Sequence, residues 1–465
     1  MPFTCFARRR SVCLLIALSA LFVFNAAMAA ERSIDRATLH RLSALDVGAS
    51  EQMDAFPVGP TAATAMRFRR VQIYSADAHI YLIGADGKHE LPRSTRVFLR
   101  GRSTDGSARV AMSLEADGSF VEGSGEGAEG AFALQARPDA SGAQIISART
   151  LESTLPAPGA FEFTCGNDKV NLDLHPDTDL ATQLQLATHP ATAPLASAPS
   201  TLRYATIAID TDSLFMSRLF SNNATTAVNW IASMFNSMNT MYETDLQVQL
   251  LVGTTFLRTS AASDPYTGLG QDVAANSADL NLFGNYWQTN EAGVPRSFAA
   301  LLSGAISSSG GSCSAAGIAW LNEYCQKSAV GSYSVTKVCT SLAIDSNGVF
   351  DSRIVGHEIG HNFGAAHTHC TNATTGASNT GTNTIDACYN GEAGSGCYAG
   401  ATSCPGGAGM SGTIMSYCNF GSGCGTQNQL HFHSTHINQV LLPKISANTP
   451  SCLKTDQIFK DGYGG

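Results

Sequence analysis

Three histidines and one glutamate between residues 357 and 367 form the clearest chemical pattern in the sequence. His357 and His361 are spaced i, i+4, so on a helix both side chains lie on one face and can bind the same metal ion. Glu358 directly follows the first histidine, and His367 comes after a glycine farther along. Three protein ligands leave one coordination position open, which is typical of a catalytic rather than a structural zinc site.

The chemistry that this pattern predicts is hydrolysis by an activated water. Zinc lowers the pKa of a bound water to about 7, and Glu358 is placed beside the first ligand to take its proton. The same carboxylate can return that proton to a leaving amine, while the metal polarises the scissile carbonyl. We therefore expect one catalytic Zn²⁺ held by His357, His361 and His367, with Glu358 as the catalytic base and no further cofactor.

The residues around the motif predict a helix and a sharp exit from it. Asp351 or Ser352 can cap the helix start. Apolar residues four positions apart give the helix a separate face for the core: Val355, Ile359 and Phe363. Gly364 suits the exit because it tolerates positive φ, so His367 can approach the metal from outside the helix.

Upstream, the sequence predicts a strand, a helix and a second strand. Tyr204 to Asp210 alternates as a strand, apolar residues at helical spacing run from Val228 to Tyr242, and Leu246 to Val252 alternates again. This order favours a parallel pair joined by a crossover helix. Gly317 to Leu321 is a further candidate strand at a sheet edge. We therefore predict an α/β (α+β) fold.

A methionine inside a turn-rich segment, Ser411 to Tyr417 (SGTIMSY), follows the histidine motif. Together, His-Glu-x-x-His-x-x-Gly-x-x-His and this turn resemble the metzincin metalloproteases. Within them the chain is similar to the adamalysin (reprolysin) group, whose LL(S/T)G strand and Gly-Ile/Leu-Ala edge strand are matched by Leu301 to Gly304 and Gly317 to Leu321. The resemblance covers roughly residues 201 to 455.

This resemblance implies a metzincin-type catalytic domain with a twisted mixed sheet, a zinc helix and a disulfide-rich C-terminal subdomain. It implies the same three histidines as zinc ligands, Glu358 as the base, and Met415 as an apolar floor beneath the metal. It also implies that the edge strand aligns an extended peptide substrate by β-augmentation.

Other residues near the motif leave alternatives open. An aspartate usually follows the third histidine in adamalysins, whereas here it is Thr368, which leaves the subfamily open. Tyr417 has the spacing of a tyrosine that can stabilise the transition state in astacins and serralysins; the alternative is a packed aromatic. Two interpretations of His369 stay open: it competes with His367 as a zinc ligand, or it does not bind the metal. Three histidines in a predicted C-terminal helix form a second metal site or simply pack: His431, His433 and His436.

The first residues predict export. Arg8 to Arg10 precede the apolar run Val12 to Phe24, and Ala27 to Ala29 is a small-x-small cleavage pattern, so residues 1–29 are predicted to be a signal peptide. The run is shorter than the about 20 residues of a membrane helix. We expect a secreted protein, extracellular or periplasmic in a Gram-negative source, in which disulfides persist.

The cysteines fit that location. Ten lie between Cys313 and Cys452, an even number compatible with five disulfides whose pairing the sequence does not reveal. Cys165 is left over. A free thiol there resembles the cysteine switch of adamalysin and matrixin propeptides, which would block the open zinc position; the alternative is a buried or intermolecular cysteine.

Composition divides the chain into regions. Residues 30–180 hold short alternating runs and are predicted to be a mainly β propeptide, and residues 181–200 an uncharged linker. The catalytic domain is predicted over 201–455 and a C-terminal tail over 456–465. Only 14% of the 465 residues are charged and the net charge is −9, which disfavours nucleic-acid and membrane-surface partners.

Together these features predict a secreted zinc endopeptidase that is made as a zymogen, acts on proteins or peptides, and is a monomer after processing. Two alternatives stay open. One is a zinc amidase acting on cell-wall peptides, and the other is a secreted binding module that retains a weakly active protease fold. The intact Glu358 and histidines argue against the binding module.

Overall fold

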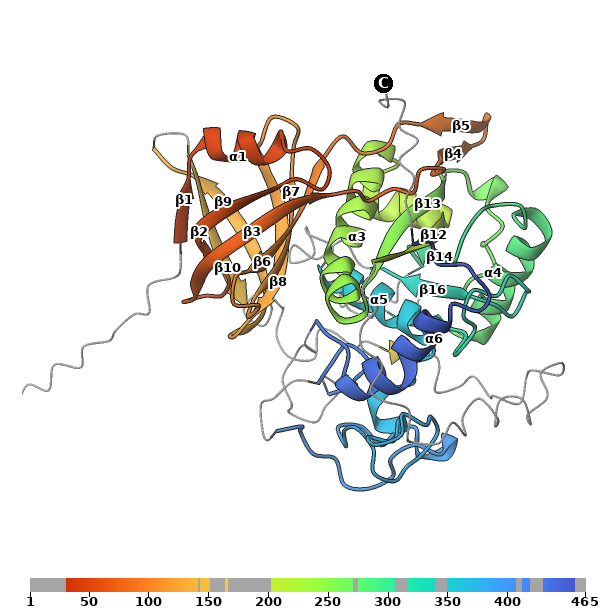
Figure 1. The fold of residues 1–465 in the computed structure, drawn as a ribbon. Helices are drawn as coiled ribbons and strands as arrows, with labels where there is room; N and C mark the ends of the chain where they lie inside the picture. The colour runs from red at the N-terminus through yellow and green to blue at the C-terminus, as the bar shows by residue number, and fades with distance from the viewer. Residues whose placement is uncertain are drawn as a thin grey trace, which may run out of the picture.

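The computed structural model describes residues 31–140, 143–150, 164–165, 202–270, 275–305, 316–338, 349–406, 412–418 and 430–455. The signal peptide, linker and tail predicted at 1–29, 181–200 and 456–465 lie outside these segments. None of the helices in the described segments has the length and apolar character needed to span a bilayer. The described chain forms an N-terminal β unit beside a larger α/β part (Figure 1).

The N-terminal unit is a curled antiparallel sheet with a core of its own. Among the described residues its strand order is β1-β10-β9-β8-β7-β6-β3-β2. Alternate positions along these strands contribute to its core, such as Val110, Met112 and Leu114 on one strand, while nearly all positions of the central strands are buried. The elements are β1 (Glu31–Ile34), α1 (Arg36–Ser43), β2 (Ser50–Pro57), β3 (Ala63–Val71), β6 (Val97–Ser103), β7 (Arg109–Leu114), β8 (Phe120–Gly127), β9 (Gly130–Pro138) and β10 (Gln144–Thr150).

The second sheet is mixed, and its order among the described residues is β11-β15-β16-β14-β12-β13-β4-β5. Its central pairs are parallel, whereas β15 runs antiparallel to β16. The strands are β4 (Ile80–Gly84), β5 (Gly87–Leu91), β11 (Thr164–Cys165), β12 (Arg203–Thr211), β13 (Val248–Arg258), β14 (Phe298–Ser303), β15 (Ala316–Ala319) and β16 (Tyr333–Lys337). The protein is therefore of the mixed α/β class that the sequence predicts.

Helices cover both faces of the second sheet. α3 (Ala224–Leu246) and α5 (Val349–Phe363) pack into one core cluster, and α4 (Ser277–Asn290) packs into a separate cluster on the other face. The predicted strand, helix and strand are β12, α3 and β13, and the two strands are parallel. Leu246, predicted in the second strand, instead ends α3, and Gln247 turns the chain with φ 53°.

The helix with the histidine motif is α5, and it begins at Val349, before the predicted caps Asp351 and Ser352. It ends at Phe363 and is followed by Gly364, whose φ of 112° is the positive value predicted for the exit. Beyond it, a loop-rich stretch leads to a π-helix (His436–Leu441) and α6 (Leu442–Ala447). His431 and His433 therefore precede the C-terminal helix that was predicted to contain them.

Disulfides hold the loop-rich stretch. Cys370 pairs with Cys397, Cys388 with Cys418, and Cys325 with Cys452. Cys404 is also disulfide-bonded. Cys313, Cys339 and Cys424 lie outside the described residues. Cross-links replace much of the apolar core that these loops lack.

Two pieces of the N-terminal stretch join the second sheet. β4 pairs in parallel with β13, and β5 forms the outer strand beside it. At the opposite edge β11 pairs in parallel with β15, with Cys165 opposite Gly317. Chain segments that precede residue 166 thus form both outer edges of this sheet.

Candidate metal centre

The three predicted histidine ligands lie together at the end of α5. His357 and His361 come from the helix, His367 comes from the turn after it, and one ring nitrogen from each lies within 4.8 Å of the others. Nε2 of His361 and Nε2 of His367 are 3.2 Å apart. Two nitrogens bound to one tetrahedral zinc at 2.0–2.1 Å would be about 3.3 Å apart. The cluster therefore has the spacing that zinc requires.

The tautomers of the two helix histidines are fixed by backbone carbonyls. Nδ1 of His357 lies 2.8 Å from the carbonyl oxygen of Ile414, and Nδ1 of His361 lies 2.7 Å from that of Ala365. Because a carbonyl oxygen only accepts hydrogen bonds, each Nδ1 carries the proton. Nε2 is then the lone-pair nitrogen that can bind a metal.

Burial keeps these imidazoles neutral. His357 and His361 are each 1% exposed. Burial is the main cause that lowers the pKa of His357 to about 3, and it lowers the pKa of His361 well below its usual value. Neutral imidazole is the form that binds a metal ion, so the site is ready for one at neutral pH.

The third histidine is held by a carboxylate, Glu392, that the sequence analysis did not identify. Oε2 of Glu392 lies 2.9 Å from Nδ1 of His367 and 2.9 Å from Nε2 of His369. Burial alone would raise the pKa of Glu392, but attraction to His367 and the hydrogen bonds from both imidazoles lower it below its usual range. Asp386 and Glu392 are the only carboxylates between His367 and residue 455, and that scarcity is the one sequence signal for Glu392.

His369 lies in a layer behind the three converging histidines. Its ring stacks on that of His367, with centroids 5.3 Å apart and an interplanar angle of 15°. His369 is not one of the three converging histidines. It belongs to a second group with His367, Cys370 and Glu392 whose ligand atoms lie within 4.8 Å of one another, but Cys370 there is disulfide-bonded to Cys397. Among the described residues, the groups that could hold a metal ion do not include His431, His433 or His436.

Glu358 is fully buried on α5, beside His357. A methyl group at Gly317 would overlap its carboxylate, so the carboxylate lies directly against β15. The strand predicted to align a peptide therefore passes next to the residue predicted to act as the base.

The methionine turn lies beneath α5. A Cβ atom built at Gly360 would be 3.0 Å from Sδ of the fully buried Met415. The carbonyl of Ile414 accepts from His357, and the carbonyl of Met415 accepts from the backbone N–H of Thr368. The turn thus contacts the helix and the segment that carries the third histidine, which is the position expected of Met415.

Thr368, which departs from the adamalysin pattern, takes part in a hydrogen-bond chain to a carboxylate elsewhere. Its hydroxyl donates to Oγ of Ser416 over 2.9 Å, and that hydroxyl donates to Oδ2 of Asp386 over 2.7 Å. Thr368 stands where adamalysins usually have an aspartate, and the carboxylate at the end of this hydrogen-bond chain comes instead from Asp386 in the disulfide-rich loop.

Tyr417 packs among the histidine rings. It is 3% exposed, and its ring centroid lies 4.3 Å from that of His367 and 6.3 Å from that of His357. This packing is the alternative that the sequence analysis left open. A role for its hydroxyl in the transition state stays a prediction.

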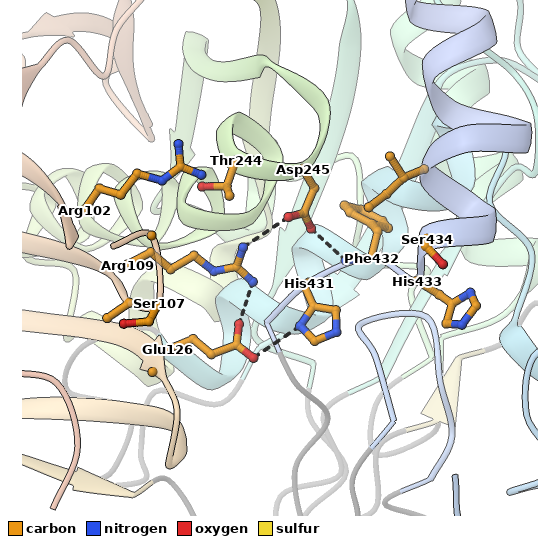
Figure 2. Close-up of a pocket in the computed structure, with 14 residues that line it drawn as sticks. Arg102, Ser107, Arg109, Glu126, Thr244, Asp245, His431, Phe432, His433 and Ser434 are labelled. Carbon is orange, nitrogen blue, oxygen red and sulfur yellow. Dashed lines mark hydrogen bonds and ion pairs between the residues drawn. The ribbon is translucent and has the colours of Figure 1, made fainter. Parts of the chain in front are cut away.

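A separate cavity of about 540 Å³ lies between the N-terminal unit and the α/β part. Figure 2 shows that Arg109 contacts both Glu126 and Asp245 there, and that Glu126 also contacts His431. None of the histidines of the metal cluster lines this cavity. The charged residues that line the cavity pair across the N-terminal unit and the α/β part, so the cavity lies at the interface between these two parts.

A comparison with protein families places the chain beside a family of metallo-peptidases. Residues 201–429 match the reprolysin-type model of metallo-peptidase family M12. The matched range includes the three converging histidines and Glu358. Among curated proteins, no match was found.

Proposed function

We propose that this chain, whose residues 201–429 belong to the reprolysin-type metallo-peptidases of family M12, binds its catalytic zinc ion through Nε2 of His357, His361 and His367. The family makes the chain a zinc metalloendopeptidase that acts on proteins or peptides. The observation that carries the ligand assignment is the convergence of three buried imidazoles at zinc spacing. A zinc ion there supplies a water of lowered pKa and polarises the substrate carbonyl.

Glu358 is proposed as the general base. Its carboxylate accepts a proton from the water that attacks the carbonyl carbon. The carboxyl group then donates that proton to the leaving nitrogen as the C–N bond breaks, so the products are a carboxylic acid and an amine. The support is its burial beside His357 and against β15.

The test compares Glu358→Gln with the parent and with Glu291→Gln, a glutamate just beyond α4. In the processed proteins, we expect parent activity on casein that phenanthroline abolishes, and a loss in kcat of about 10²–10⁴-fold in Glu358→Gln. Zinc content should be unchanged in both variants. Equal turnover by Glu358→Gln would mean that another group is the base, and a metal-free parent would overturn the ligand assignment.

We also infer that an extended substrate pairs with β15. This strand is one of the two edge strands that the described sheet has without the N-terminal stretch, and the added strand β11 pairs with it there. A peptide that takes the place of β11 would gain main-chain hydrogen bonds while its backbone passes Glu358.

The proposed zymogen depends on the same edge. Residues 1–29 are proposed as the signal peptide, 30–180 as the propeptide, and the disulfides support secretion. Because Cys165 lies opposite Gly317, and Gly317 touches the carboxylate of Glu358, the N-terminal stretch occupies the strand position of a substrate. We propose that the thiol of Cys165 keeps the unprocessed chain latent.

Substitution of Cys165 tests this latency. Unprocessed Cys165→Ala should cleave a fluorogenic peptide without removal of the N-terminal stretch, whereas unprocessed parent should not. Thr164→Ala, which keeps the thiol on the same short strand, is the control and should stay latent. A Cys165→Ala variant as inactive as the parent would exclude the thiol as the blocking group.

A further inference from the structure

We infer that Glu392 is a positioning residue whose carboxylate holds the imidazole of His367 in the orientation and tautomer that zinc binding requires. This inference rests on the proposed zinc site. It adds a residue that the histidine motif does not contain. The direct observation is the distance of 2.9 Å between Oε2 of Glu392 and Nδ1 of His367, with both side chains buried.

His367 is the ligand that most needs an external support. The other two ligands stand on a regular helix and donate to carbonyls of the backbone. His367 lies beyond Gly364, so its backbone is not part of the hydrogen-bond ladder of α5 that holds the other two ligands. Its ring is instead anchored by a side chain 25 residues later in the sequence.

The loop that carries Glu392 is itself fixed to the same segment. The disulfide between Cys370 and Cys397 ties the residues just after His367 to those just after Glu392. His369 donates to the same oxygen of Glu392 and accepts a hydrogen bond from Tyr398 N–H through its own backbone carbonyl. The carboxylate is therefore held in place by contacts within the protein.

A carboxylate is chemically suited to this position. An acceptor on Nδ1 leaves the lone pair on Nε2, and an ionised acceptor makes the stronger hydrogen bond. Acceptors that hydrogen-bond the second ring nitrogen of a ligating histidine fix the orientation of the ring and raise its basicity. Their loss typically costs about 10–100-fold in metal affinity. Without Glu392, two buried imidazole N–H groups would also lose their acceptor.

The experiment measures zinc affinity rather than turnover. Full-length parent, Glu392→Gln, Glu392→Ala and the control Glu291→Gln are stripped of metal, and zinc binding is titrated in competition with a chromogenic chelator. Cobalt(II) is then added to each, because its visible absorption bands report the geometry of the ligands. Circular dichroism of the metal-free proteins checks their folding, and if Glu392→Ala does not fold, the nearly isosteric Glu392→Gln carries the test.

We expect Glu392→Gln to bind zinc about 10–100-fold more weakly than the parent and to give shifted cobalt bands. Glu291→Gln should match the parent in both measurements. Parent-like affinity and an unchanged cobalt spectrum in Glu392→Gln would overturn the role of Glu392 and leave the proposed function standing. A parent that binds no zinc would overturn the proposed function, and this inference with it.

Discussion

At the scale of single residues, Gly317 sets the position of the proposed catalytic base. Ala in its place would put a methyl group into the carboxylate of Glu358, and β15 is held in register by its antiparallel pairing with β16. We expect Gly317→Ala to lower kcat by about 10–100-fold, because small displacements of reacting groups are that costly. Zinc content, measured by atomic absorption, should not change.

Ile318→Val is the matched control for Gly317→Ala. It changes the same strand at a neighbouring position whose side chain points to the other face of the sheet. Its kcat should stay close to that of the parent. Parent-like turnover by Gly317→Ala would show that Glu358 does not need its place against β15.

The histidine motif was predictable because its geometry is local. The helix period alone brings His357 and His361 together, and a glycine after the helix allows the turn to His367. Glu392 and Asp386 reach the site through loops with no period, so no spacing rule connects them to it. Only the scarcity of carboxylates in that stretch marks them in the sequence.

At the scale of elements, local patterns predicted some strands and helices of the α/β part but not α4, β16 or the outer strands from the N-terminal stretch. β12, α3 and β13 follow from alternation and helical spacing, and the short β15 from its apolar run. The predicted start of α5 was three or four residues too late, because a good capping residue can also lie inside the first turn of a longer helix.

The strands β4, β5 and β11 show the limit of local patterns. They pair with β13 and β15, which lie far away in the sequence, and such partners depend on the whole fold rather than on the strand itself. Disulfide pairing has the same limit, because ten cysteines allow many connectivities. Both features were therefore found only in the structure.

At the scale of the whole molecule, the N-terminal unit and the α/β part share packing and charge. Val71, Ile73 and Ile80 join the core cluster that contains α3 and α5. Arg96 bridges the two parts, since it pairs with Glu122 on β8 and donates to Ser233 on α3. The two parts should therefore unfold together in the unprocessed chain.

Glu122 gives this joint stability a pH dependence. Burial raises its pKa to about 7, against the hydrogen bond with Ser233 and the charge of Arg96. As pH rises from about 4.5, the unfolded chain releases this proton while the folded chain keeps it, so the contribution of Glu122 to the free energy of unfolding falls until the pH passes the folded pKa. Above about pH 7 the loss is complete.

Glu122→Gln should remove this fall in the free energy of unfolding with rising pH, because glutamine stays neutral in the folded and the unfolded states. Relative to the parent, the free energy of unfolding of the variant should rise by on the order of 2–3 kcal/mol between about pH 4.5 and 7.5. Urea unfolding in a Glu358→Ala background avoids self-digestion, and Glu115→Gln, which removes the other carboxylate on Arg96, controls for lost charge. The contrary result is a difference in free energy of unfolding between Glu122→Gln and its background that stays constant across this pH range. It would show that Glu122 is already ionised in the folded protein, in a permanent ion pair with Arg96.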